Sequence, residues 1–306
     1  MASIPVRTQA GYARSTTQRQ FVLTKLRAIV LSYIGLDFLA THMMNDPYFM
    51  LGPTDLPPPA HLAWLHPLAL HAYRALFVLG GIYGALQYIF SANDLLQYYV
   101  LSALIPGGRA ELWNHTSIFG DFSQVLDRGL AGFWAAWWHQ TFRFGFKAPT
   151  NWLVRHGWLD PKASSTQVVK LGLAFLGSSI LHACGSYTAV PDTKQWRAPL
   201  FFSLQFLGIF VQASAVVALG DRLAGLPRWA ARTGNALFVV AWLYCTAKPF
   251  MDDVSSAGLW LLEPVPVSLF RWLGQGHPSD SWWRWGEDMG GLWYSGKHWW
   301  QSGMIS

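Results

Sequence analysis

The sequence has few charged residues. Asp, Glu, Lys and Arg make up only 12% of its 306 residues, whereas soluble globular domains contain about 25%. Hydrophobic residues make up 52% of the chain and aromatic residues 16%, including 18 tryptophans. An ordinary soluble enzyme and a disordered chain are therefore both excluded, because neither carries so much apolar surface with so little charge.

Cysteine is scarce, and the common nucleotide and metal motifs are missing. The two cysteines, Cys184 and Cys245, lie in apolar stretches, where thiols usually act as small core residues. Two cysteines do not build a disulfide framework. The chain has no G-x-x-x-x-G-K-[ST], G-x-G-x-x-G, C-x-x-C or H-E-x-x-H pattern. We therefore expect neither redox chemistry nor a bound metal.

The net charge of the chain is +6. A clustered basic patch would indicate a nucleic-acid partner, but the Lys and Arg residues are scattered between apolar runs. Scattered basic residues are typical of the cytoplasmic flanks of membrane spans. The composition thus predicts an all-α, polytopic transmembrane bundle that binds no nucleic acid and has the lipid bilayer as its surroundings.

Apolar runs close to 20 residues long predict the individual spans. We expect seven or eight membrane segments within a single domain. The apolar runs lie at about 28–44, 68–90, 95–105, 132–146, 168–187, 199–219, 235–250 and 258–273. The runs at 95–105 and 132–146 are short, so they are predicted to be either two spans or two re-entrant pieces.

The flanking segments predict the orientation and the ends of the bundle. Residues 45–67 contain no Lys or Arg, whereas the N-terminal flank and the loop at 221–234 are basic. The positive-inside rule therefore places residues 1–27 in the cytosol, ahead of a bundle at 28–273. The Trp-rich tail at 274–306 is predicted to lie at the membrane interface, where tryptophan is enriched.

Ionisable groups within apolar runs are the best candidates for a functional site. Asp37 lies midway in the first predicted span, as a structural hydrogen-bonding group or as a functional one. His182 lies deep in a long apolar run, one helical turn from Ser178 and Ser179, so these residues share a helix face. Two interpretations of His182 stay open: a core histidine bonded to a serine, or a neutral general base in a buried cavity.

A second candidate is the aromatic segment around His139. On a helix, His139 and Arg143 share a face, and Ala135 and Ala136 leave space beside the imidazole on the preceding turn. One interpretation is an aromatic segment at the membrane interface. The other is an element that binds a substrate.

Three motifs of the chain resemble the wax synthase-like, fungal branch of the membrane-bound O-acyltransferases. The first is the F-W-x-x-x-W-H segment that ends at His139, after a polar loop. The second is the F-L-x-S-x-x-x-H run that ends at His182, and the third is the E-P-x-P-x-S-L stretch that begins at Glu263. With their flanking spans, the motifs cover about residues 20 to 275.

The resemblance implies an enzyme of the endoplasmic reticulum membrane that moves an acyl group from CoA to a hydroxyl of a lipophilic acceptor. Acetyl is the implied acyl group. A terpenoid or another secondary metabolite is the implied acceptor. His182 would be the catalytic base and His139 the second catalytic residue. The implied substrate-binding residues are Trp134, Trp138, Gln140, Ser178 and Ser179, and those implied for the CoA phosphates are Arg143 and Lys147.

One departure from the family pattern leaves other functions open. The family usually has basic residues within the F-W-x-x-x-W-H segment, where this chain has Ala135, Ala136 and Trp137. A membrane-embedded terpene cyclase is the first alternative, because aromatic rings stabilise cations; its acid would be one of Asp37, Asp94 and Asp121. A membrane transporter or scaffold is the second, but it needs several charges inside the membrane.

Overall fold

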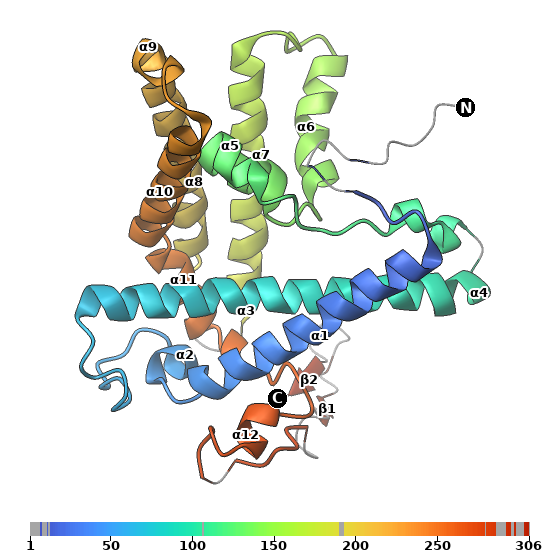
Figure 1. The fold of residues 1–306 in the computed structure, drawn as a ribbon, viewed down its shortest axis with the longest axis vertical. Helices are drawn as coiled ribbons and strands as arrows, with labels where there is room; N and C mark the ends of the chain where they lie inside the picture. Colours follow the sequence, from blue (N-terminus) through green and yellow to red (C-terminus); the bar gives the residue numbers. More distant parts are fainter. Residues whose placement is uncertain are drawn as a thin grey trace.

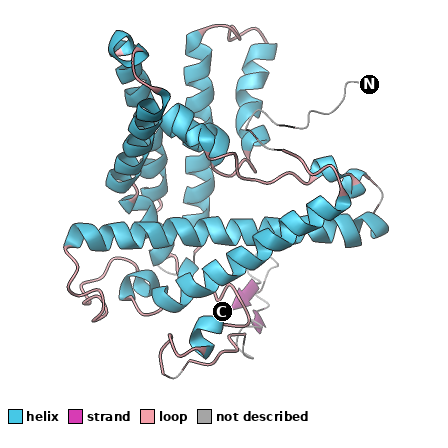
Figure 2. Ribbon diagram, viewed as in Figure 1, coloured by secondary structure: helices cyan, strands magenta, loops and turns pink. Residues whose placement is uncertain are grey.

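The structure is a computed structural model, and the chain is almost entirely helical (Figure 1 and Figure 2). It describes residues 7, 11, 13–105, 107–189, 193–278, 280–285, 292–294, 297 and 303–305. The longer α-helices are α1 (Gln18–Met43), α3 (Pro67–Leu96), α5 (Ser123–Gly132), α6 (Arg143–Arg155), α7 (Ser164–Tyr187), α8 (Arg197–Ala218), α10 (Arg228–Thr246) and α11 (Lys248–Ser256). The short ones are α2 (Pro47–Leu51), α4 (Ser102–Leu104), α9 (Gly220–Ala224) and α12 (Leu269–Trp272).

Several short elements complete the fold. Two π-helical segments are η1 (Gln97–Leu101) and η4 (Phe133–Trp137). Three 3-10 turns are η2 (Gly108–Ala110), η3 (Leu112–Asn114) and η5 (Leu259–Leu261). In the tail, β1 (Leu292–Tyr294) pairs antiparallel with β2 (Gly303–Ile305). The prediction of a helical fold is thus confirmed for the bundle, while the tail adds one short pair of strands.

The local sequence explains where the first two long helices begin. The Thr17 hydroxyl accepts a hydrogen bond from the amide of Gln20 at 3.2 Å, which satisfies one of the unpaired N–H groups of the first turn of α1. Pro67 opens α3, where its missing N–H is harmless because that position has no helical partner. His66 caps the same end, since its Nδ1 accepts from the amide of Leu68.

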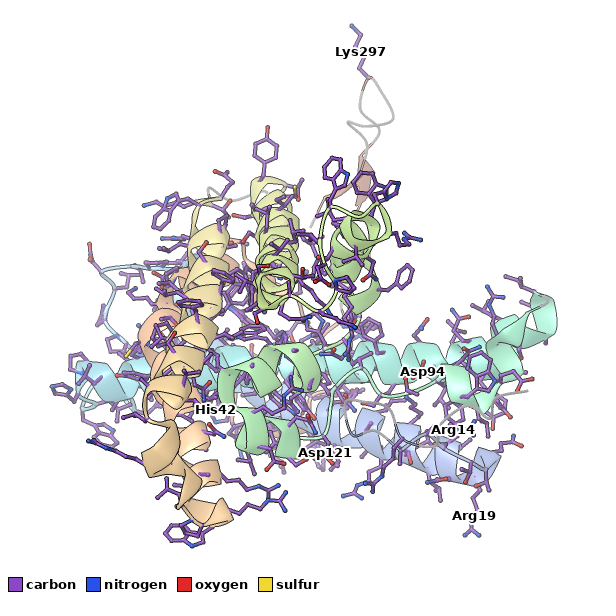
Figure 3. The ribbon with its side chains drawn as sticks, turned by 90° about the horizontal axis from the view of Figure 1, so that it is seen from above. Arg14, Arg19, His42, Asp94, Asp121 and Lys297 are labelled. Carbon is purple, nitrogen blue, oxygen red and sulfur yellow. The ribbon has the colours of Figure 1, made fainter. Side chains whose placement is uncertain are left out.

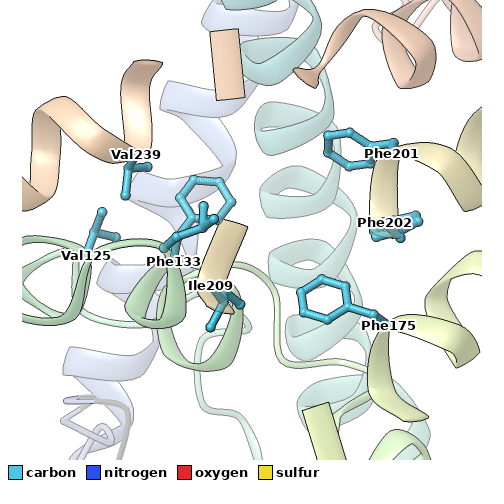
Figure 4. Packing of buried hydrophobic residues seen from close by; sticks show 8 residues of the cluster. Val125, Phe133, Phe175, Phe201, Phe202, Ile209 and Val239 are labelled. Carbon is cyan, nitrogen blue, oxygen red and sulfur yellow. The ribbon is translucent and has the colours of Figure 1, made fainter. Parts of the chain in front are cut away.

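The helices form two layers that cross each other (Figure 1 and Figure 3). Helices α1 and α3 run side by side in one layer, while α7, α8 and α10 stand across them. The main core lies between α5, η4, α7, α8 and α10 (Figure 4). Its buried members are Val125, Leu130, Phe133, Phe175, Phe201, Phe202, Ile209 and Val239.

Three helices of the described chain are long and apolar enough to cross a membrane. They are Pro67–Leu104, which joins α3, η1 and α4, together with Ser164–Tyr187 and Arg197–Ala218. These helices support an integral membrane protein, but they do not confirm the expected seven or eight segments. The runs at 28–44 and 235–250 lie in α1 and in α10 with α11, outside these three.

Two short apolar runs are not separate spans. The run at 95–105 continues α3 as one long helix. The run at 132–146 contains η4, a loop and the first turn of α6. Helical structure stops at Trp138, whose φ of −59° and ψ of 150° are those of extended chain. The predicted helix through both His139 and Arg143 is therefore wrong.

Residues 258–273 do not form the predicted span either. They contain only η5 and α12, joined by chain without helical structure. The carboxylate of Glu263 accepts hydrogen bonds from Arg271 at 3.0 Å and from Arg284 at 2.7 Å. The apolar run suggested a span, but these ion pairs, together with Pro264, favour a segment without a continuous helix.

Asp37 has the structural role. Its side chain is fully buried in α1 and accepts hydrogen bonds from the Ser268 hydroxyl and from the amides of Leu269, at 2.7 Å, and Phe270, at 3.2 Å. These amides belong to the first turn of α12, so Asp37 stabilises the start of that helix.

Of the predicted interfacial tail, Trp299 and Trp300 lie outside the described residues.

Candidate functional site

A cavity of about 720 Å³ opens between the two layers of helices. Most residues implied by the family resemblance line it, namely His182, His139, Trp134, Trp138, Gln140, Ser178, Arg143 and Lys147. Ser179 does not, because its buried hydroxyl donates to the carbonyl of Phe175 at 2.8 Å within α7. The remaining walls are mostly apolar side chains of α3, α8, α10 and α11. The cavity therefore joins segments that lie far apart in the sequence.

His182 lies on the face of α7 that borders the cavity. Its ring stacks on Phe202, with centroids 4.9 Å apart, and meets the edge of Phe250 at 5.4 Å. Its imidazole makes no hydrogen bond to the residues that the structure describes. The interpretation as a core histidine bonded to a serine is therefore wrong, and the ring nitrogens are free for a ligand in the cavity.

His139 reaches the same cavity from a loop. Two backbone hydrogen bonds hold this loop against the preceding polar segment: Gly120 N donates to Trp137 O, and Gln140 N donates to Ile118 O, both at 2.7 Å. A Cβ on Gly120 would lie 1.9 Å from the carbonyl oxygen of Ala136, so only glycine allows this approach. His139 and His182 therefore line the same cavity.

Two buried nitrogens of this loop region have no hydrogen-bond partner in the described chain. They are Nδ1 of His139 and Nε1 of Trp134, and both residues line the cavity. A buried polar group without a partner costs roughly 1–3 kcal/mol. Such groups are tolerated when a ligand satisfies them, so they point to a polar atom of a bound molecule.

Burial lowers the pKa of His139 below its ordinary value of 6.5, so the folded protein holds this ring neutral near pH 7. Unfolding exposes the ring, which then binds a proton below pH 6.5. We therefore expect the thermal stability of the detergent-solubilised protein to fall as the pH drops below about 6.5, and His139→Gln to weaken this dependence.

The measurement is a series of thermal unfolding midpoints between pH 5 and pH 8. His156→Gln is the control, because His156 is exposed at the end of α6 and does not line the cavity. The same pH slope for the wild-type protein and both variants would contradict the prediction.

Four basic side chains line one part of the cavity: Arg128, Arg143, Lys147 and Lys170. The described lining contains no Asp or Glu, and none of the four forms an ion pair with a described acidic residue. Burial and the charges of Arg143 and Lys170 lower the pKa of Lys147. A cluster of like charges without counter-charge is suited to an anionic ligand.

Sequence reasoning missed Arg128 and Lys170. Lys170 belongs to a row on α7 with Ala174, Ser178 and His182, each four residues from the next. Residues at this spacing lie on one side of a helix. The sequence alone could therefore have placed Lys170 on the same face as His182. Arg128 had no such signal, because only the packing of α5 against the bundle brings it to the cavity.

The acids proposed for a terpene cyclase lie away from the cavity. Asp37 caps α12, and Asp94 pairs with Lys25 and His115. Asp121 accepts from the amide of Ser123 at 2.8 Å. None of the three acids lines the cavity.

Residues 113–204 match the membrane bound O-acyl transferase family. The matched stretch includes His139, His182, Arg143, Lys147 and Lys170. The match supports the membrane-bound O-acyltransferase family that the motifs indicated, and it leaves the wax synthase-like branch unresolved.

Three curated relatives are similar over part or most of the chain. Acetyltransferase ple2 of Rhodocybe pseudopiperita is 27% identical over 57% of this chain and 46% of its own length. Acetyltransferase pyr8 of Aspergillus fumigatus is 24% identical over 50% and 37%. Acetyltransferase ataH of Aspergillus terreus is 27% identical over 84% and 86%. The chain thus spans less than half of the first two relatives. No solved structure matches it significantly.

Proposed function

We propose that the protein is a membrane-bound O-acyltransferase that moves an acyl group from CoA to the hydroxyl of a lipophilic acceptor. The observation that carries the proposal is the cavity itself, where two histidines border both an apolar wall and four cations that form no ion pair within the described chain. A cavity divided in this way can hold an apolar acceptor and an anionic donor together. The relatives named acetyltransferases favour acetyl as the acyl group.

His182 is the proposed general base. It takes the proton from the acceptor hydroxyl as the oxygen attacks the thioester carbonyl. The carbon–sulfur bond then breaks, and the protonated ring returns the proton to the departing CoA thiolate, so the histidine ends unchanged. His182 suits this role because its nitrogens have no described hydrogen-bond partner and because Phe202 and Phe250 hold its ring.

Trp134 and His139 are the proposed donors to the oxyanion. The carbonyl oxygen becomes negative when the acceptor attacks, and donors already in place stabilise that charge. Trp134 Nε1 is a buried donor without a partner. His139 contributes an N–H in its neutral form, with the tautomer set by which nitrogen meets the substrate.

The basic residues are the proposed site for the CoA phosphates. Arg143 and Lys147 were implied by the family, and Lys170 and Arg128 join them in the structure. Along α7, Lys170 and His182 are separated by about 18 Å at a rise of 1.5 Å per residue. The pantetheine arm of CoA, which separates its thioester from its phosphates, is an extended chain of similar length.

The apolar wall is the proposed acceptor site, with Trp138, Gln140 and Ser178 at its border with the histidines. The acceptor class that we propose is a terpenoid or similar secondary metabolite, which matches the absence of acidic groups from the described lining. A location in the endoplasmic reticulum and a place in the wax synthase-like branch are parts of the same proposal.

The test is an acyl-transfer assay with membranes that contain the full chain. They are supplied with acetyl-CoA and a panel of hydrophobic alcohols, and free CoA and esters are measured. We expect CoA release that depends on the acceptor, together with the matching ester. Conversion of a polyprenyl substrate without CoA, or no ester with any acceptor and donor length, would overturn the proposal.

A further inference from the structure

Helix α5 is broken at Gly129, shortly before the segment that carries His139. Gly129 has φ 58° and ψ −135°, a region of positive φ that favours glycine because it has no Cβ. In an unbroken helix the amide of Leu130 would donate to the carbonyl of Leu126, four residues earlier. The break turns these two backbone groups away from each other.

Two amide side chains connect the separated groups. Leu130 N donates to Gln212 Oε1 at 2.9 Å, and Gln212 Nε2 donates to Asn235 Oδ1 at 2.9 Å. Asn235 Nδ2 then donates to Leu126 O at 2.8 Å. Gln212 belongs to α8 and Asn235 to α10, so this amide relay ties three helices together. It joins the same two backbone groups that a regular helix would pair directly.

The relay and the break depend on each other. A Cβ on Gly129 would lie only 1.9 Å from Nε2 of Gln212, so the relay leaves no space for a side chain there. The surroundings are apolar, with Val125, Ile209 and Val239 in the neighbouring core (Figure 4). Backbone groups that lose their partners in such surroundings are strongly destabilising, as in the interior of a membrane.

The break sets the direction of the chain that follows it. Beyond Leu130 the chain forms η4, which carries Trp134, and then reaches His139. The far end of this segment is held by the backbone bonds of Gly120 and Ile118. The relay holds the near end. The segment from 130 to 140 is thus fixed at both ends, and neither Gln212 nor Asn235 lines the cavity.

We propose that Gln212 and Asn235 are positioning residues that act through the break in α5. Their relay holds η4 at the angle that brings Trp134 and His139 to the cavity. The inference rests on the proposed function for the roles of Trp134 and His139. The relay itself exists independently of the reaction, and its effect on the segment can be measured without activity.

The experiment compares Gln212→Leu with Gln205→Leu. Gln205 is the matched control, because it also belongs to α8 and its Nε2 donates to Thr246 of α10 at 3.0 Å. Both variants lose an amide that links α8 to α10, but only Gln212 contacts the break. We expect both to lose stability, whereas only Gln212→Leu lowers kcat, by about 10²-fold for a displacement of about 1 Å, with little change in KM for the donor.

Amide hydrogen exchange supplies the second readout. We expect faster exchange over residues 126–140 in Gln212→Leu than in Gln205→Leu. If Gln212→Leu does not fold, Gln212→Asn replaces it, because it keeps the amide but is too short to complete the relay. Equal losses of kcat in both variants, or equal exchange over this segment, would overturn the proposal. A wild-type protein without transfer activity would contradict the proposed function, and exchange alone would then decide the relay.

Discussion

His182→Ala is expected to lower the rate of acyl transfer by about 10²–10⁴-fold, the usual contribution of a general base. The loss should appear in kcat, because the histidine acts on the acceptor proton only as the new bond forms. The KM for acyl-CoA should change little, since the basic cluster lies at the other end of the α7 row from His182. Ester formation in membranes with equal amounts of folded protein measures both constants.

His71→Ala is the control for this experiment. His71 is also a partly buried histidine of the bundle, and its Nε2 contacts the carbonyl oxygen of Tyr244 at 2.9 Å. It does not line the cavity. We expect it to retain most of the activity. Similar kcat values for His182→Ala and the wild-type protein would remove His182 from the mechanism, and equal losses in the two variants would make its effect structural.

Removal of two charges from the basic cluster should weaken donor binding strongly. A hydrogen bond to a charged group contributes about 1.5–3 kcal/mol, and 1.4 kcal/mol corresponds to about a tenfold change in affinity. We therefore expect Arg143→Gln with Lys170→Gln to raise the KM for acyl-CoA by about 100-fold. The kcat should fall much less, because these residues lie away from the reacting carbonyl.

Lys162→Gln is the control, because Lys162 is exposed in the loop before α7 and lies outside the cavity lining. Salt provides an independent check. Added salt should raise the KM of the wild-type protein for the donor, and that of the double variant less, because fewer charges remain to be screened. An unchanged donor KM in the double variant would exclude this cluster as the phosphate site.

Part of the candidate site followed from helical periodicity. His182 lies on α7, and its spacing to Ser178 places both on the cavity side, as the sequence predicted. The same periodicity wrongly placed Ser179 at the cavity. Its hydroxyl instead donates to the carbonyl of Phe175 within α7. Spacing along one helix defines a face to within about one residue position, and contacts with other helices decide which part of that face is open.

His139 and Arg143 were predicted to come together for a reason that the structure does not support. No helix joins them, since the chain is extended at Trp138. They reach one cavity because the backbone of Gly120 pairs with the loop and the relay of Gln212 holds its start. Neither contact leaves a local pattern in the sequence, because each joins residues that are distant along the chain.

The expected span at 258–273 is wrong for a related reason. An apolar run shows that a segment avoids water, but it does not show whether the segment is a helix. Residues 258–273 are apolar on average, yet their charged groups are paired. Arg271 within the segment and Arg284 beyond it donate to Glu263, and the distant Asp37 accepts from the amides at the start of α12. These interactions favour a folded segment over a span.

The scarcity of charge, together with the apolar runs, was enough by itself to indicate a helical membrane protein, and the helical repeat was enough to select His182. Both are properties of composition or of short-range order. Only the tertiary structure decided where the remaining charges lie. It gathers Arg128, Arg143, Lys147 and Lys170 beside one cavity and moves every candidate acid away from it, because electrostatic interactions depend on distance in space and not on distance along the chain.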